Sequence, residues 1–158
     1  MSGTLSTSSR DELRSSSPWA SACWSRYAPR SGAPAIARCG LARDADDGLV
    51  RLAVAMPEGT VTLANLDDNG VIALTGARPT NYRTLQVKGH GAHRITRPEM
   101  DQLVVRHRAA FVDEVCAVGL ARAAANAMWS TRFVAIAFVP DALFGQAPGP
   151  AAGLVLGA

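Results

Sequence analysis

The sequence predicts an α+β fold in which antiparallel strands close into a barrel, and three observations lead to this prediction. Segments with alternating or β-branched apolar residues recur along the chain, and short stretches of Gly, Pro, Asn and Asp join them, which favours antiparallel pairing. A short helical pattern follows the third of these segments, and a longer one precedes the last. Closing such a sheet removes exposed strand edges.

Length and composition limit the class of protein. The 158 residues suit one hydrophobic core, and the 48% of apolar residues predicts a folded body. The net charge of +3 comes from arginines spread along the chain, which favours a solvated surface over a nucleic-acid site. No secretory leader and no apolar run of membrane-spanning length is visible. We therefore expect a cytoplasmic protein that binds neither nucleic acid nor a membrane.

The cysteines and histidines do not form a metal or disulfide pattern. Cys23, Cys39 and Cys116 are odd in number and far apart, so we expect small buried side chains and no disulfide framework or zinc knuckle. His90 and His93 are three residues apart on an expected strand, which places them on opposite faces. The sequence therefore predicts no metal site.

The N-terminal half reads as a tail, three strands and one helix. Residues 1–17 are rich in Ser and Thr and predict a flexible tail. Asn69-Gly70 is suited to ending a helix in the left-handed conformation. The remaining boundaries come from alternation and from turn residues. The expected strands are residues 19–27, 35–43 and 49–56, and the expected helix is residues 60–69.

The C-terminal half reads as two strands, a long helical segment and a last strand. Thr96-Arg-Pro-Glu99 predicts a helix start with a capping box. Residues 121–128 either extend that helix or form a second one after Gly119. The expected strands are residues 71–77, 85–95 and 131–140, the domain is residues 18–153 with a loop-like end, and residues 154–158 are a tail. The predicted apolar stripe of the helix comprises Met100, Leu103, Val104, His107, Phe111, Val115 and Val118, with Arg106, Arg108, Asp113 and Glu114 off it.

This element order, together with particular residues, resembles the pyridoxamine 5'-phosphate oxidase-like FMN-binding split barrels. The residues that carry the resemblance are Asn65-Leu66 and Asn69-Gly70 before a strand, ARPTNYRTLQVKG at 77–89, and FGQAPGPAAG at 144–153. The resemblance implies an antiparallel split β-barrel, an FMN-dependent oxidoreductase with a small-molecule substrate, and a homodimer with FMN in clefts between the subunits. A deazaflavin or haem is the alternative cofactor.

The resemblance also assigns cofactor-binding residues. A phosphomonoester needs several charge-assisted bonds, and Arg38 matches the family's arginine on the second strand, whereas Arg43 stands where the family has a lysine. Gln86 matches a flavin-contacting glutamine, and Lys88 shares its strand face. The family's Arg-Lys phosphate clamp is replaced here by residues 56–60, Met-Pro-Glu-Gly-Thr.

Within that replaced segment, Thr60 at a helix N-terminus can still offer a hydroxyl and an N–H group to a phosphate, while Glu58 would repel one. No catalytic acid or base stands out. Trp19, Trp24 and Trp129 are expected in the core or at a dimer interface, with cofactor stacking as a further option. The competing hypothesis is a non-catalytic split-barrel module that binds a metabolite, haem or a protein partner without flavin chemistry.

Overall fold

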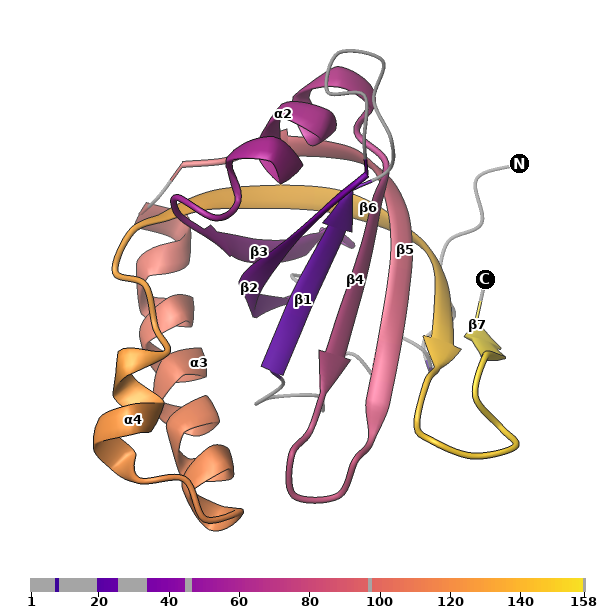
Figure 1. The fold of residues 1–158 in the computed structure, drawn as a ribbon. Coiled ribbons are helices and arrows are strands. Elements are labelled where there is room, and N and C mark those ends of the chain that lie inside the picture. The colour runs from indigo at the N-terminus through magenta and orange to yellow at the C-terminus, as the bar shows by residue number, and fades with distance from the viewer. Residues whose placement is uncertain (1–7, 9–19, 26–33, 45–46, 97, 158) are drawn as a thin grey trace.

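A computed structural model describes residues 8, 20–25, 34–44, 47–96 and 98–157 of the chain, and Figure 1 shows their arrangement. The predicted tail at residues 1–17, apart from Ser8, lies outside this range, and so does Trp19, which the sequence places in the core or at an interface. The elements in chain order are β1 (Ala20–Ser25), β2 (Ala35–Asp44), β3 (Val50–Ala55), α2 (Thr60–Asn69), β4 (Ile72–Ala77), β5 (Thr84–Arg94), α3 (Pro98–Ala117), α4 (Arg122–Ala127), β6 (Phe133–Gly145) and β7 (Leu154–Gly157).

The strands form one antiparallel sheet that closes on itself. The order is β3-β2-β1-β4-β5-β6-β7, and β6 also pairs with β3. Closure depends on the length of β6, because residues 133–138 pair with β3 while residues 136–145 pair with β5. Every pairing is antiparallel. The predicted α+β barrel is confirmed.

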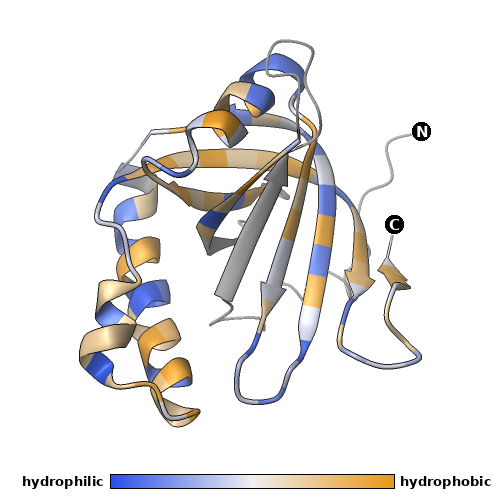
Figure 2. Ribbon diagram, viewed as in Figure 1, coloured by the Kyte–Doolittle hydropathy of each residue, from blue (hydrophilic) through white to orange (hydrophobic). Residues whose placement is uncertain are grey.

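Alternation along the strands separates the barrel interior from its outer face. Buried and more exposed residues alternate along β4 and along the first half of β5, and Figure 2 shows the corresponding bands of hydropathy on β5. Since successive strand side chains point to opposite faces, the apolar set fills the interior. The largest fully buried apolar side chains of this core are Leu52, Ile72, Leu74, Ile136, Phe138 and Leu143.

Helix α2 lies across one end of the barrel (Figure 1). Its bounds match the predicted helix, and Leu63 and Leu66 enter the interior cluster. Gly70 ends the helix with φ 65, and its N–H donates to the Leu66 carbonyl oxygen. The Asn69-Gly70 pair therefore acts as predicted, because glycine adopts the left-handed conformation without a steric cost.

Strand β5 bends where the sequence is rich in glycine. Its register against β6 shifts between Lys88 and Gly89 and again between His90 and His93. A Cβ atom on Gly89 would lie closer than 3 Å to the Val139 carbonyl oxygen. The residue is thus required for the close approach of β5 and β6.

The last of the predicted strands, which corresponds to β6, extends further toward the C-terminus than predicted. The expected strand ends at Pro140, whereas β6 continues to Gly145 and then pairs with β7. Pro140 is paired with Gly89 at the bulge, where Asp141 is the extra residue. A proline is tolerated in a sheet at such a bulge because a ladder hydrogen bond is already interrupted there.

Two features of the α3 prediction are wrong. Val118 lies beyond the end of α3 and is 54% exposed, and Glu114 is buried although the stripe leaves it on the polar side. The other apolar residues of the stripe pack in two clusters, one around Met100 against β3 and β6 and one around Phe111 against α4, while His107 packs against Trp129. Helix α4 is separate from α3, with Gly119 between them at φ 101.

The remaining chemical groups do not form a cluster of metal ligands. His90 Nδ1 lies 2.7 Å from Asp141 Oδ1, and His93 Nδ1 lies 2.9 Å from the Gly91 carbonyl oxygen. Across the described ranges no group of three or more His, Cys, Asp or Glu could hold a metal ion. None of the helices in those ranges combines the length and apolar character needed to cross a membrane.

Candidate functional site

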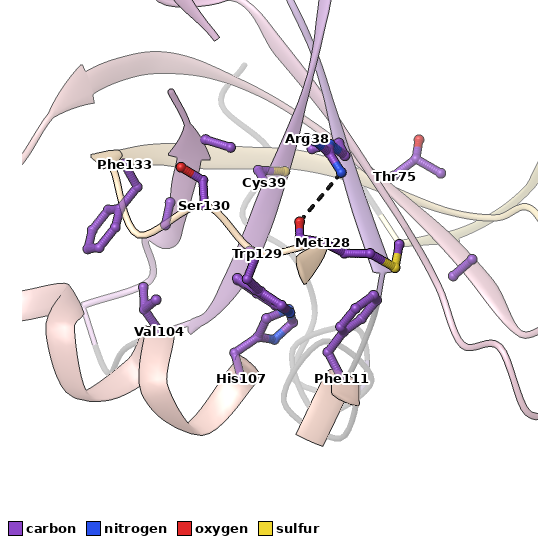
Figure 3. Close-up of a pocket in the computed structure, with 14 residues that line it drawn as sticks. Arg38, Cys39, Thr75, Val104, His107, Phe111, Met128, Trp129, Ser130 and Phe133 are labelled. Atoms are coloured by element: carbon purple, nitrogen blue, oxygen red, sulfur yellow. Dashed lines mark hydrogen bonds between the residues drawn. The ribbon is translucent and has the colours of Figure 1, made fainter. Parts of the chain in front are cut away.

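A pocket of about 370 Å³ lies between the outer face of the barrel and the helical layer (Figure 3). Its floor is formed by the outer face of β2, β3 and β4. Its other wall is formed by α3 and by the segment that joins α4 to β6. The lining residues are Arg38, Cys39, Gly40, Ala53, Ala55, Thr75, Ala77, Val104, His107, Phe111, Met128, Trp129, Ser130 and Phe133.

Small residues on the floor create the space. Gly40, Ala53, Ala55 and Ala77 line it, and none has a side chain larger than a methyl group. A Cβ atom on Gly40 would lie 3.2 Å from the Trp129 ring, which is tighter than ordinary van der Waals contact. The missing side chain at this position therefore lets the indole approach β2.

The helical wall is aromatic. His107 and Trp129 meet edge to face, with ring centroids 5.5 Å apart at 73°, and Phe111 meets Trp129 in the same manner at 5.6 Å and 78°. His107 is only 6% exposed. The Trp129 Nε1 atom is buried and has no hydrogen-bond partner among the described residues. The wall is thus built of closely packed rings, with one buried donor that has no partner among the described residues.

Arg38 is the cation of the pocket, and a carboxylate already pairs with it. Its Nη2 atom lies 3.2 Å from Glu58 Oε1, and its Nη1 donates to the Met128 carbonyl oxygen at 3.5 Å, which is the dashed line in Figure 3. The side chains of Arg38 and Glu58 are 60% and 48% exposed. An ion pair this exposed is weak, of the order of 0 to 1 kcal/mol, but it offsets the positive charge locally.

A cross-strand row connects Arg38 to Gln86. Arg38 pairs with Ala22, Ala22 with Thr75, Thr75 with Gln86, and Gln86 with Phe144. Gln86 Nε2 donates to Thr75 Oγ1 at 3.1 Å, and Thr75 lines the pocket. Three strand spacings separate Arg38 from Gln86, roughly 14 Å. Two of the residues predicted from the sequence therefore belong to one outer face, on either side of Thr75.

Of the other predicted residues, Gln86, Lys88 and Thr60 are not among the described residues that line the pocket. Lys88 shares the outer face with Gln86, and its Nζ atom lies 4.6 Å from the centroid of the Phe144 ring. The Thr60 hydroxyl donates to the Pro57 carbonyl oxygen at 2.7 Å. Arg43 occupies the irregularity in the pairing of β2 with β3, and its side chain lies outside the described structure.

A buried carboxylate fixes α3 to the loop between β4 and β5. Glu114 accepts hydrogen bonds from Arg78 Nε at 2.9 Å and from the Thr80 hydroxyl at 2.6 Å. Burial raises the pKa of Glu114, but the hydrogen bonds from Thr80 and Arg78 and the positive charge of Arg78 lower it further, so the pKa lies below its ordinary value. The contact holds the helix that carries His107 and Phe111.

Sequence reasoning missed part of the site. It placed His107 on the apolar stripe of the helix and Trp129 in the core or at an interface, with cofactor stacking as a further option, and it did not single out Thr75. The outward positions of three strands carry glycine or alanine opposite an apolar helical stripe. That combination indicates a hollow between helix and sheet, and it was available from the sequence.

Comparisons with known proteins bear on the fold. No family model matches the chain, and no curated protein matches its sequence. A solved F420 reductase is 19% identical with a TM-score of 0.51, covering 80% of this chain and 90% of its own.

Two further solved structures are also similar to the chain. They are general stress protein 26 from Bacillus anthracis str. Sterne (10% identity, TM-score 0.49, 86% of this chain and 92% of its own) and a candidate pyridoxamine 5'-phosphate oxidase from Corynebacterium glutamicum (11%, 0.44, 89% and 89%). At 19% identity, the likeness to the F420 reductase is one of fold alone.

Proposed function

We propose that this chain, which has the split-barrel fold of the pyridoxamine 5'-phosphate oxidase-like proteins, binds the ring of FMN or of a related deazaflavin and uses it for redox chemistry on a small-molecule substrate. The observation that carries the proposal is the pocket of about 370 Å³ between α3 and the outer sheet face. Cofactor sites are concave and mostly apolar, with a few placed polar groups, and this pocket has that character.

The residues present suit a flavin-type ring. Such a ring is flat, with an apolar benzenoid end and a polar pyrimidine end. Val104, Phe111 and Phe133 offer apolar walls. Because the Thr75 oxygen already accepts from Gln86, its hydroxyl hydrogen is available to donate into the pocket.

The chain would position the ring and exclude water. When bound, a flavin or deazaflavin supplies two-electron redox chemistry, and the protein supplies binding, orientation and electrostatics. The apolar lining would exclude water from the enclosed face of the ring, and Thr75 would fix its orientation. No side chain among those described is assigned as an acid or a base.

A second copy of the chain completes the proposal. Figure 1 shows no described helix over the outer side of β4 and β5. The outward side chains there include Ala73 and Gln86, and Phe144 lies beside Gln86 on the neighbouring β6; each is only partly exposed. A homodimer that covers this face would enclose the open side of the pocket. Mass measurement of the native protein tests it, since a monomer at micromolar concentration would contradict a stable dimer.

The spectrum of the purified protein tests cofactor binding. We expect a flavin band, or saturable binding of added FMN. A ligand at a hundred times its Kd stabilises the native state by about 2.7 kcal/mol, which raises the Tm of a domain of this size by roughly 5 to 10 °C. A colourless protein whose Tm does not respond to FMN, riboflavin or a deazaflavin would contradict the proposal.

The second candidate is a module without flavin chemistry that binds a metabolite, haem or a protein partner. The Arg38 and Glu58 ion pair favours it, because a carboxylate lies where a phosphate would need positive charge. A Soret band in place of a flavin band would support the haem version of this candidate. If the protein shows neither a flavin band nor a Soret band but retains a small molecule, that result would support the metabolite version.

A further inference from the structure

We infer that the pocket selects its ligand by the ring and that it does not recognise a terminal phosphomonoester. The inference rests on the proposed function, because it concerns the same site. It narrows the ligand class to flavin-type rings for which a dianionic phosphate adds little affinity. Riboflavin and FMN would then bind with Kd values within about threefold of each other.

The supply of positive charge is the first reason. A phosphomonoester carries a charge of about −1.5 to −2 at pH 7, and tight binding requires several charge-assisted bonds. Among the described residues that line the pocket, Arg38 is the one with a permanent positive charge. The Nζ atom of Lys88 lies over the Phe144 ring, and Lys88 is not among the described residues that line the pocket. One exposed guanidinium is a weak phosphate site.

The position of Glu58 is the second reason. Its Oε1 atom lies 3.2 Å from Arg38 Nη2, so the carboxylate already accepts from one of the two terminal nitrogens of the guanidinium. A phosphate on Arg38 must therefore displace the carboxylate or lie beside a like charge. Either arrangement reduces what the phosphate contributes to affinity.

The start of α2 is the third and independent reason. The N-terminus of a helix can hold a phosphate when its N–H groups are available. Here the Gly59 N–H donates to the Ala55 carbonyl oxygen at 2.9 Å, and the Thr60 N–H donates to the Pro57 carbonyl oxygen at 3.1 Å. The Thr60 hydroxyl donates to the same Pro57 oxygen at 2.7 Å. The donors of Gly59 and Thr60 are therefore used within the turn itself.

The experiment compares riboflavin and FMN as probes in three proteins. Kd values are measured by fluorescence titration for the wild type, Glu58→Gln and Asp67→Asn. Asp67 is the control, because it is equally exposed at 48% and also pairs with an exposed arginine, Arg94, although through two hydrogen bonds where Glu58 and Arg38 share one. Asp67 does not line the pocket, and both variants remove one negative charge.

The expected result is a specific change in the ratio of the two Kd values. An exposed charge interaction changes an equilibrium by up to about fivefold, and the phosphate carries nearly two charges. Glu58→Gln should therefore raise the preference for FMN over riboflavin by about three- to tenfold. Asp67→Asn should leave the ratio unchanged. The gain in Glu58→Gln should shrink in 1 M salt, where the Debye length is about 3 Å.

Three other results have distinct meanings. If the wild type binds FMN clearly more than threefold tighter than riboflavin, the inference is overturned while the proposed function stands. If neither probe binds any of the three proteins, the proposed function fails, and the inference fails with it. An unchanged ratio in Glu58→Gln would show that the carboxylate does not oppose the phosphate. Melting curves verify that each variant is folded.

Discussion

Replacing Glu114 with glutamine tests how the helical wall of the pocket is held. The side chain of Glu114 is 10% exposed and that of Arg78 is 37% exposed. The substitution removes the negative charge of a carboxylate that contacts the Arg78 guanidinium at 2.8 and 2.9 Å and accepts a hydrogen bond from the Thr80 hydroxyl at 2.6 Å. Hydrogen bonds to charged groups contribute about 1.5 to 3 kcal/mol, and Arg78 can regain some hydration. We expect a loss of about 1.5 to 3 kcal/mol, or roughly 3 to 10 °C in Tm.

Thermal unfolding at several pH values is the assay. The pKa of Glu114 is lower in the folded protein than its ordinary value of 4.5, so the stabilisation is fully present above the unfolded pKa and is lost as pH falls through the folded pKa. The difference in Tm between wild type and variant should be constant near pH 7 and shrink below about pH 4.5.

The neighbouring substitution Asp113→Asn is the control for Glu114→Gln. Asp113 pairs with Arg122 at 2.8 Å, but both side chains are more than 60% exposed. We expect almost no change in Tm from this variant. An equal Tm for Glu114→Gln and the wild type at pH 7 would refute the anchoring role of the carboxylate.

Two further predictions concern glycines. Gly89→Ala should destabilise the fold by about 2 kcal/mol or more, because its Cβ atom would meet the backbone of β6. Gly145→Ala should be tolerated, because the atom nearest to its Cβ would be 3.8 Å away. Denaturant unfolding of both variants checks this, and equal stabilities would contradict it. Gly40→Leu should displace the Trp129 ring and fill the pocket. Riboflavin binding should then weaken more than tenfold in a fluorescence titration, and an unchanged affinity would show that the flavin ring binds elsewhere.

Local sequence features predicted the elements of the fold that depend on near neighbours. The bounds of α2 and its left-handed end at Gly70 follow from a short apolar pattern and an Asn-Gly pair. The bend of β5 follows from its glycines. These features act through backbone conformation within a few residues, and this is why they can be read without the fold.

Features that depend on pairing across the chain were not predictable in this way. The strand prediction stopped at Pro140, because only the pairing with Gly89 at a bulge shows that a proline fits there. Glu114 was placed with the polar residues, because its partners Arg78 and Thr80 lie 36 and 34 positions away. The sequence suggested Arg38 and Gln86 as cofactor contacts, but only the register places Thr75 between them.

The most direct test of the central claim is a crystal structure of the protein grown with saturating riboflavin or FMN. We expect the flavin ring in the pocket between Trp129 and the outer sheet face, with its polar edge against the Thr75 hydroxyl. We expect any terminal phosphate to make no bond to the Gly59 or Thr60 N–H groups. A ring bound at another surface while this pocket stays closed would contradict the account.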